Sequence, residues 1–414
     1  METFKLAKQV EDQVIHIRRH LHEYPEISME EENTIAFVTN KLKEIGIPYE
    51  VVPKGGIIGV IEGRAGGKSL ILRAELDALP MQEAETNLSQ QKVVISQIAD
   101  VAHTCGHDAH MAMLLGSAKI LYENRKNLNG KVLLAFEQGE EMGGGIYALL
   151  KRLTEIGADG IWGVHVKNDL PSGKISVDPG PRMAGFFPFH VKITGKSGHG
   201  SRPDLASSPI DCFTHFHQQL TAMRLTSLNP HDPITISIGS VSSGSALNII
   251  PDSLQFSGTA RFLNYKQGQS ASKEFKRLLA TTCNLHSCTY EYILEPIAKD
   301  LLVYNQEQCA EIARKSITTS MGKEMIATFP AWMASEPFAY YQKYFPGVFA
   351  FLGIKNEAKG TGTEHHNIHF DIDEHVMKIG VAATVQYTID FLKYNDQFHF
   401  VPENRSVEAL FENN

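Results

Sequence analysis

The pattern of strands and helices that the sequence predicts changes near the middle of the chain and later returns. In its first part, short apolar runs typical of strands alternate with helical patterns, and the same alternation returns from about residue 300. Two turns in succession, Pro179-Gly180 and Gly180-Pro181, open a stretch of alternating apolar and polar residues between the two parts. The pattern therefore predicts that one domain interrupts another.

The outer part of the chain is expected to form an α/β domain. Because helical stretches separate its apolar runs, the strands are predicted to form a mostly parallel central sheet that is largely buried. Val348–Leu352 is a further buried strand, and 374–393 is a closing helix. The earlier runs are Gly59–Gly63, Ser69–Ala74 and Lys131–Phe136, with helices over 108–126 and 145–156.

The N-terminal segment, residues 2–47, is predicted to form a pair of helices. Val10, Val14, Ile17 and Leu21 fall at helical spacing, and a second set of apolar residues follows Pro25. Gly46 is expected to end the second helix.

The inserted part is predicted to be a smaller α+β domain with one antiparallel sheet and two helices. Its strands cover 189–194, 234–238 and 254–262, and its helices cover 209–227 and 268–282. The expected domain limits are 1–181 and 294–414 for the outer domain and 182–293 for the inserted one.

Length and charge exclude some classes of protein. A chain of 414 residues exceeds the usual size of one hydrophobic core, which again favours two domains. A net charge of -8 without a basic run offers no surface for nucleic acid. The charged N-terminus and the absence of a long apolar run predict a soluble, cytoplasmic protein with no membrane partner.

The five cysteines predict reduced thiols. They are few, scattered and odd in number, so a disulfide framework is not expected. Cys283 and Cys288 flank His286, but a structural zinc site would need a second pair of ligands, so these thiols are interpreted as structural.

The stretch His103-Thr-Cys-Gly-His-Asp-Ala-His110 has the ligand types for a divalent metal. Thiolate and imidazole bind such ions, and the Cys105-x-His107 spacing lets both reach one cation from a turn. Without a second closely spaced pair, the remaining ligands would come from distant carboxylates and histidines, as in catalytic sites. A nucleophilic role for Cys105, with its pKa lowered by a neighbouring histidine, is the alternative interpretation.

Three other polar clusters lie at points where apolar runs end. Glu140 and Glu141 follow the run that ends at Phe136, His165 follows another apolar run, and His365 and His366 stand together near the end of the chain. Ligands bind at the carboxyl ends of strands in α/β sheets, so one glutamate could bind a metal while its neighbour faces the substrate. Taken alone, the glutamates are more typical of a solvated acidic turn, and His165 is more typical of a half-buried, hydrogen-bonded histidine.

In these motifs the chain resembles the M20 metallopeptidase and amidohydrolase family, in particular its N-acyl-L-amino-acid amidohydrolase branch, which includes hippurate hydrolases and plant auxin-conjugate hydrolases. The resemblance runs from Arg18-Arg-His-Leu-His-Glu-Tyr-Pro-Glu26 to Phe370-Asp-Ile-Asp-Glu374. It implies a zinc-peptidase-like catalytic domain, an inserted lid domain that mediates homodimerisation, and two divalent metal ions per subunit. Zn²⁺ or Mn²⁺ is expected, with Co²⁺ or Ni²⁺ as alternatives.

The resemblance also implies roles for individual residues. Cys105 corresponds to the bridging metal ligand, and Glu140 to the general base. Asp77 corresponds to the carboxylate that supports the site, and His199 to a lid histidine that reaches the partner subunit's active site. The further ligands are His107, Glu141, His165 and His366, and the residues that hold the substrate are Asn248 and Arg261.

The chain departs from the family pattern at three places. Glu75 stands where aspartate is usual, Glu137-Gln-Gly replaces Gln-Pro-Ala, and Ile368 replaces proline. No ligand or base is lost, so the departures bear on substrate preference more than on activity. His365 and His369 have no assigned role.

The resemblance implies hydrolysis of N-acyl-L-amino acids to a carboxylic acid and a free amino acid. Metal would activate a water molecule, and Glu140 would take its proton and deliver it to the leaving nitrogen. The alternatives are a dipeptidase, a deacetylase of N-acetyl amino acids such as N-acetylcysteine, a thiol-dependent enzyme, and a binding protein that has lost catalysis. The complete ligand set, with Glu140, argues against the last.

Overall fold

A computed structural model describes residues 2–412 of the chain, which form two compact units. Within the described residues, unit 1 comprises 2–180, 304–329 and 337–412, and unit 2 comprises 181–303 and 330–336. β7 (Gly180–Met183) and β14 (Val303–Asn305) lie where the chain passes from one unit to the other. Among the described residues, no helix is long and apolar enough to span a membrane.

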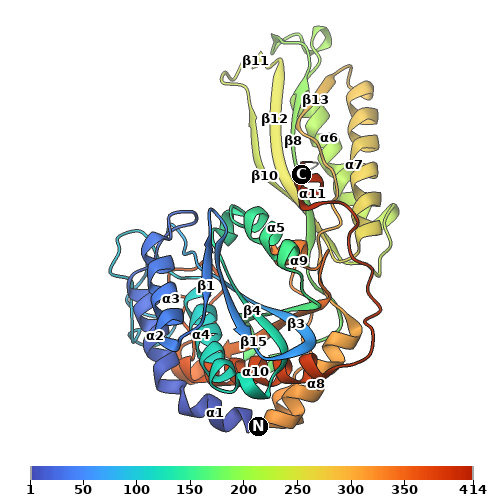
Figure 1. The fold of residues 1–414 in the computed structure, drawn as a ribbon. Helices are drawn as coiled ribbons and strands as arrows, with labels where there is room; N and C mark the ends of the chain where they lie inside the picture. The colour runs from blue at the N-terminus through green and yellow to red at the C-terminus, as the bar shows by residue number, and fades with distance from the viewer. Residues whose placement is uncertain (1, 413–414) are drawn as a thin grey trace. The chain divides into compact units, whose positions relative to one another are not determined.

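Unit 1 is built on a seven-stranded sheet of order β1-β2-β4-β3-β5-β15-β6 (Figure 1). The four central strands, β4, β3, β5 and β15, run parallel, and the pairs toward both edges are antiparallel. The predicted α/β class with a parallel centre is therefore confirmed. The strands are β1 (Tyr49–Val52), β2 (Gly56–Glu62), β3 (Arg64–Glu75), β4 (Asn129–Glu137), β5 (Gly160–Pro171), β6 (Ile175–Ser176) and β15 (Gly347–Lys355).

Helices cover both faces of this sheet. In Figure 1, α4 and α10 lie against one face, and α5 with the short α9 lies on the other. The predicted first N-terminal helix is divided at Val10 into α1 and α2, and Gly46, with φ +92°, ends α3 as expected. The helices are α1 (Thr3–Gln9), α2 (Glu11–Glu23), α3 (Glu32–Ile45), α4 (His107–Glu123), α5 (Ile146–Ile156), α8 (Glu307–Met321), α9 (Phe338–Tyr341), α10 (Met377–Lys393) and α11 (Val407–Glu412).

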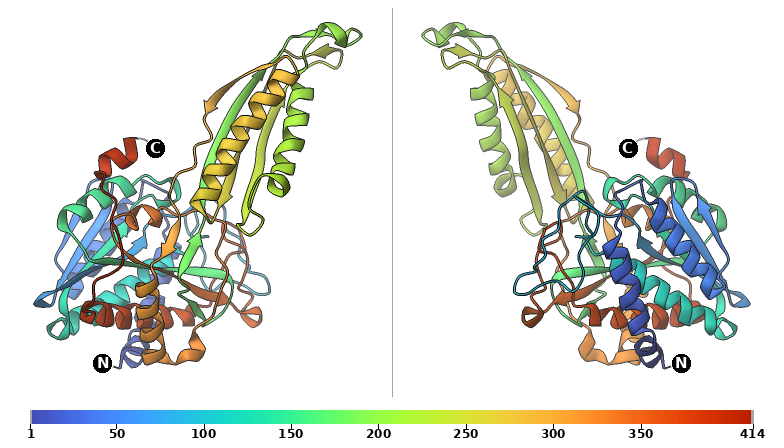
Figure 2. Two further views of the ribbon diagram at one scale, coloured as in Figure 1. Left: turned by 90° about the vertical axis from the view of Figure 1, so that its right-hand side faces the viewer. Right: turned by 90° about the vertical axis from the view of Figure 1, so that its left-hand side faces the viewer.

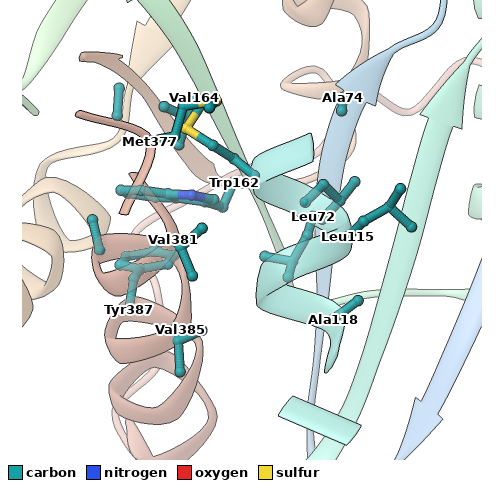
Figure 3. Packing of buried hydrophobic residues seen from close by; sticks show 14 of the residues in the cluster. Leu72, Ala74, Leu115, Ala118, Trp162, Val164, Met377, Val381, Val385 and Tyr387 are labelled. Atoms are coloured by element: carbon teal, nitrogen blue, oxygen red, sulfur yellow. The ribbon is translucent and has the colours of Figure 1, made fainter. Parts of the chain in front are cut away.

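The core of unit 1 lies between the sheet and helices α4 and α10 (Figure 3). Trp162 of β5 stacks on Tyr387 of α10 with ring centroids 4.4 Å apart, and its indole N–H donates to Thr384 Oγ1 at 3.0 Å. Satisfying the indole N–H is what allows so large a side chain to be fully buried. This packing fixes β5, the strand that carries His165.

Unit 2 contains a four-stranded antiparallel sheet of order β10-β12-β8-β13, with α6 and α7 on one face (Figure 2). Along β8, alternate residues from Phe187 to Ile193 are buried against the helices, which is the period of a strand with one covered face. The predicted smaller α+β domain is confirmed. Its elements are β8 (Gly185–Thr194), β9 (Gly198–His199), α6 (Pro209–Thr226), β10 (Ile234–Ser243), β11 (Ile249–Ile250), β12 (Ser253–Phe262), α7 (Tyr265–Leu285) and β13 (Thr289–Leu294).

The five cysteines, all within the described residues, form no disulfide, and all are buried. Cys283 packs in the core of unit 2, where its sulfur lies 3.7 Å from that of Cys212. The Cys283 and Cys288 thiols therefore have the packing role expected for them.

Candidate active site

The candidate site lies at the carboxyl ends of the parallel strands of unit 1. Asp77 follows β3, Glu140 and Glu141 begin the one-turn helix η2 (Glu140–Met142) after β4, and His165 lies at the middle of β5. His107 begins α4 beside them. This is the edge of an α/β sheet at which ligands bind, because the strand ends and the helix N-termini meet there.

Cys105, His107 and His165 form one group of donor atoms, which all lie within 4.8 Å of one another. Cys105 Sγ is 3.6 Å from His165 Nε2. His165 donates its Nδ1–H to the carbonyl of Val166 at 2.7 Å, so the tautomer that faces Cys105 has an unprotonated Nε2. Burial lowers the pKa of His165 well below its ordinary value, which keeps the ring neutral and able to bind a metal.

Cys105 also belongs to a second group with Glu141 and His366, again with all donor atoms within 4.8 Å. Glu141 Oε1 lies 3.2 Å from His366 Nε2. His366 adopts φ +57°, a conformation that is uncommon for residues other than glycine, and its backbone N–H donates to Thr104 O at 3.0 Å. The His366 side chain is 49% exposed, so this side of the site is open to solvent.

The donor atoms fit a divalent metal ion. Within residues 2–412, His107 Nε2 is buried without a hydrogen-bond partner, although a buried ring nitrogen normally has one. A thiolate, three imidazoles and a carboxylate make the mixed S, N and O set that binds Zn²⁺ and similar ions. The structure thus brings together all five residues predicted as ligands.

His107 is held by Asp77. Its Nδ1–H donates to the backbone oxygen of Asp77 at 2.9 Å and lies 3.2 Å from Asp77 Oδ1. Asp77 Oδ2 in turn accepts from Ser28 Oγ at 2.6 Å and from the Glu141 N–H at 3.0 Å. Burial opposes the charged ring, but the Asp77 bond and nearby carboxylates raise the pKa of His107 to about 10. A bound cation would replace the Nε2 proton.

Glu140 is a buried carboxylate beside the ligands. Its Oε2 lies 3.8 Å from His107 Nε2, and it shares a group of donor atoms with His107 and Asp77. Gly139 precedes it with φ +65° and Gly143 follows the turn with φ +64°, so the backbone conformation that presents both glutamates depends on glycine at each end.

The sequence did not predict a network of buried charged residues that lies next to the candidate ligands. His110 donates its Nδ1–H to Glu75 Oε2 at 2.8 Å and accepts from the Val166 N–H at 2.9 Å. Arg73 donates to Glu75 and, from Nη2 at 2.7 Å, to Glu137. Glu75 and Glu137, both departures from the family pattern, therefore share one guanidinium. The i, i+3 spacing of His107 and His110 places both on one helix face, and this spacing could have indicated that His110 also lies near the site.

The two unassigned histidines lie outside the two donor groups that share Cys105. His365 is buried, and its ring meets that of His165 edge to face at 5.3 Å between centroids. His369 donates from Nδ1 to the carbonyl of Thr86 at 2.8 Å, so its side chain connects two loop segments of unit 1.

The other predicted site residues belong to unit 2. His199 is exposed in β9 and contacts Ser201 Oγ at 2.8 Å through Nδ1. Asn248 lies beside it, because the Gly200 N–H donates to the Asn248 carbonyl at 2.8 Å. Arg261 Nη1 donates to the Met333 carbonyl at 3.3 Å and approaches Ser335 Oγ at 3.5 Å.

The sequence matches the family model "Peptidase family M20/M25/M40" over residues 71–389. The chain is 33% identical to thermostable carboxypeptidase 1 of Saccharolobus solfataricus, over 93% of this chain and 97% of that protein. It is 32% identical to the IAA-amino acid hydrolase ILR1-like 2 of Arabidopsis thaliana, over 94% and 88% of the two chains. It is also 32% identical to N-acetyl-L-cysteine deacetylase of Bacillus subtilis, over 88% and 85%.

Among solved structures, the chain resembles the YXEP protein of Bacillus subtilis, which is described as a dinuclear metal binding peptidase from the M20 family. The TM-score is 0.80 at 28% identity, and the match covers 93% of this chain and 99% of that one. The likeness therefore extends over both units.

Proposed function

Because the chain belongs to peptidase family M20/M25/M40, we propose that it hydrolyses N-acyl-L-amino acids to a carboxylic acid and a free amino acid. It is a metal-dependent amidohydrolase that acts on a small amino-acid conjugate. The observation that carries the proposal is that Cys105 belongs to two adjacent donor groups while Glu140, a carboxylate outside both of them, lies beside His107.

The proposed cofactor is a pair of divalent ions, which would be held by the two donor groups that have Cys105 in common. His107 and His165 would complete the ligands of one ion, and Glu141 and His366 those of the other. Such ions lower the pKa of water toward neutrality and polarise the amide carbonyl. The sulfur ligand favours Zn²⁺ and the carboxylate tolerates Mn²⁺, and Co²⁺ and Ni²⁺ suit the same donors.

Glu140 is the proposed proton carrier. It takes a proton from the attacking water and delivers it to the amide nitrogen, which leaves as an amine only when protonated. This role needs a carboxylate that is close to the ligands without being one. Asp77 supports the reaction indirectly, because it orients His107 and accepts from the Glu141 N–H.

Unit 2 is the proposed lid and dimerisation domain. Arg261 would exchange its bonds to Met333 and Ser335 for the substrate's α-carboxylate, whose two oxygens match a guanidinium. Asn248 would bind the substrate carbonyl. His199, exposed in this subunit, would polarise the scissile carbonyl in the active site of a homodimer partner.

Two alternative substrates have support among the relatives. Similarity to a protein named N-acetyl-L-cysteine deacetylase favours N-acetyl amino acids, and similarity to a carboxypeptidase favours dipeptides. The test is hydrolysis of a panel by enzyme reconstituted with Zn²⁺ or Mn²⁺. The panel varies the acyl group on one amino acid and then the amino acid under one acyl group.

The proposed function predicts the highest kcat/KM for an aryl or longer acyl group on an L-amino acid with a free carboxylate. Methyl esters of the same compounds are the matched control, because they remove the charge that Arg261 would bind. Preference for acetyl groups or for dipeptides would replace the proposal with one of the alternatives. Esters that react as fast as the acids would remove Arg261 from substrate binding.

A further inference from the structure

The C-terminal segment 394–412, here called the strap, runs over the outside of unit 1 after α10 (Figures 1 and 2, dark red). Residues 394–406 form neither helix nor strand, and α11 follows. Gln308 of α8 holds the start of the strap, since its side chain donates to the Gln397 carbonyl at 3.2 Å and accepts from the His399 N–H at 2.6 Å. The strap lies beyond the family match, which ends at residue 389.

The strap ends in an aromatic contact between two helices. The ring of Phe411 stacks on Tyr340 of α9 with centroids 4.7 Å apart and meets Tyr147 of α5 edge to face at 5.3 Å. Val407 and Leu410 of α11 are buried. One side chain of the strap thus contacts both helices that lie on this face of the sheet.

The strap also holds the segment around α9. A helix of one turn has little stability of its own, so α9 depends on its tertiary contacts. The Glu403 N–H donates to the Lys343 carbonyl at 2.7 Å, and Tyr344 Oη donates to the Arg405 carbonyl at 3.1 Å. Beside these contacts, Tyr341 of α9 donates its hydroxyl to Glu137 Oε2 at 3.0 Å, and Glu137 is the last residue of β4. Gln138 and Gly139 then lead into η2 (Glu140–Met142), here called the glutamate turn.

The other helix that Phe411 contacts follows the same turn. Tyr147 is the second residue of α5, and only Met142 and Gly143–Gly145 separate Glu141 from this helix. Glycines leave such a turn with many accessible backbone conformations. The placement of Glu140 and Glu141 therefore depends on how firmly β4 and α5 are held at its two ends.

We propose that the strap is a positioning element for the glutamate turn and that Phe411 is its main positioning residue. By contacting Tyr147 and Tyr340 at once, Phe411 holds α5 after the turn and α9, whose Tyr341 binds Glu137 before it. The inference rests on the proposed function only where Glu141 is taken as a ligand and Glu140 as the base. The strap itself touches no reacting group.

The test compares Phe411→Ala with Val401→Ala, which removes an exposed apolar side chain from the same strap. Zn²⁺ affinity is measured by competition with a chromophoric chelator, and amide hydrogen exchange is followed over 138–150 and 338–345. We expect Phe411→Ala to weaken Zn²⁺ binding about tenfold and to speed exchange in both segments about tenfold. Val401→Ala should match the wild type, and Phe411→Tyr should restore both values.

Wild-type Zn²⁺ affinity and exchange in Phe411→Ala would overturn the inference. If that variant does not fold, Tyr344→Phe, which removes one bond between the strap and the α9 segment, replaces it and should show the same changes to a smaller degree. The measurements use no substrate. If Phe411→Ala weakens Zn²⁺ binding but the wild type hydrolyses no compound of the panel, the role of the strap is supported and the proposed substrate is rejected. If the wild type hydrolyses the panel as proposed but Phe411→Ala keeps the wild-type Zn²⁺ affinity, only the role of the strap is rejected.

Discussion

Asp77 holds His107 from two directions, because His107 Nδ1 lies 2.9 Å from the backbone oxygen of Asp77 and 3.2 Å from its Oδ1. With Nδ1 engaged, the ring presents Nε2 toward Glu140 and Glu141, at 3.8 and 3.9 Å. One aspartate therefore selects both the tautomer and the direction of a candidate metal ligand.

Replacing Asp77 with alanine should weaken metal binding. The backbone bond to His107 remains, but the carboxylate bonds to His107 and to the Glu141 N–H are lost. We expect Zn²⁺ affinity to fall roughly 10- to 100-fold, as measured by chelator competition. Asp12→Ala, on an exposed face of α2, is the control. Equal affinities in the two variants would show that Asp77 does not orient the ligand.

Replacing Glu140 with glutamine should separate metal binding from catalysis. The amide keeps the size of the side chain but cannot carry the proton, so kcat should fall by roughly 10² to 10⁴ while metal content is unchanged. Metal analysis and turnover on the same preparation provide the test, with Glu155→Gln on the exposed side of α5 as control. Near-normal turnover would assign the base elsewhere.

Replacing Cys105 with alanine should affect both donor groups, because its sulfur belongs to each of them. The number of bound Zn²⁺ ions measured after dialysis should fall below that of the wild type, and Cys309→Ala, in α8, should keep the wild-type value. Chelation should abolish activity and added Zn²⁺ or Mn²⁺ should restore it. Activity that survives chelation but not thiol alkylation would favour the thiol-dependent alternative.

Glu83 predicts an acid-sensitive contribution to stability. Burial alone would raise its pKa, but bonds from His22 at 2.9 Å and Lys92 at 2.7 Å lower the pKa of Glu83 to about 2. Since the folded-state pKa lies below the unfolded one, the stabilisation is full above about pH 4.5 and is lost as the pH falls toward 2.

The difference in unfolding free energy between wild type and Glu83→Gln should therefore shrink by about 3 kcal/mol between pH 6 and pH 2. Denaturant unfolding across this range measures it, with Glu155→Gln as the control. A difference that does not change with pH would mean that the carboxylate of Glu83 is not preferentially stabilised in the folded protein.

The proposed role of His199 predicts complementation between subunits. Glu140→Gln and His199→Ala homodimers should each be nearly inactive, but a mixed dimer contains one active site in which both residues are intact. Mixing the variants should therefore recover part of the wild-type rate. Subunit exchange is verified by native mass spectrometry, and exchange without recovered activity would count against a shared active site.

The fold class could be predicted because it depends on local patterns. β3 and β5 are buried on both faces of the sheet, and strands of this kind appear in the sequence as short continuous apolar runs. Along β8, apolar residues alternate with more exposed ones, which indicates that one face of that strand is covered. The division of the first helix at Val10 was not predicted, because the apolar spacing continues through the break.

The charge network around Arg73 could not be predicted either. Glu75 and Glu137 come from neighbouring strands, and only the β3–β4 register brings both to one guanidinium. Likewise, nothing local indicates that Phe411 contacts Tyr147 and Tyr340, since these residues are separated by long stretches of chain and meet only through packing.

By itself, the sequence determined which side chains are available and what chemistry they suit: a thiolate and imidazoles for a divalent ion, and adjacent carboxylates for binding and proton transfer. Only the tertiary structure decided that residues 105, 107, 141, 165 and 366 form two groups that share Cys105. The physical reason is that ligand type is a property of each residue, whereas a metal site requires donor atoms within a few ångströms. In this chain, that distance is set by the order of parallel strands and the packing of α4 against them.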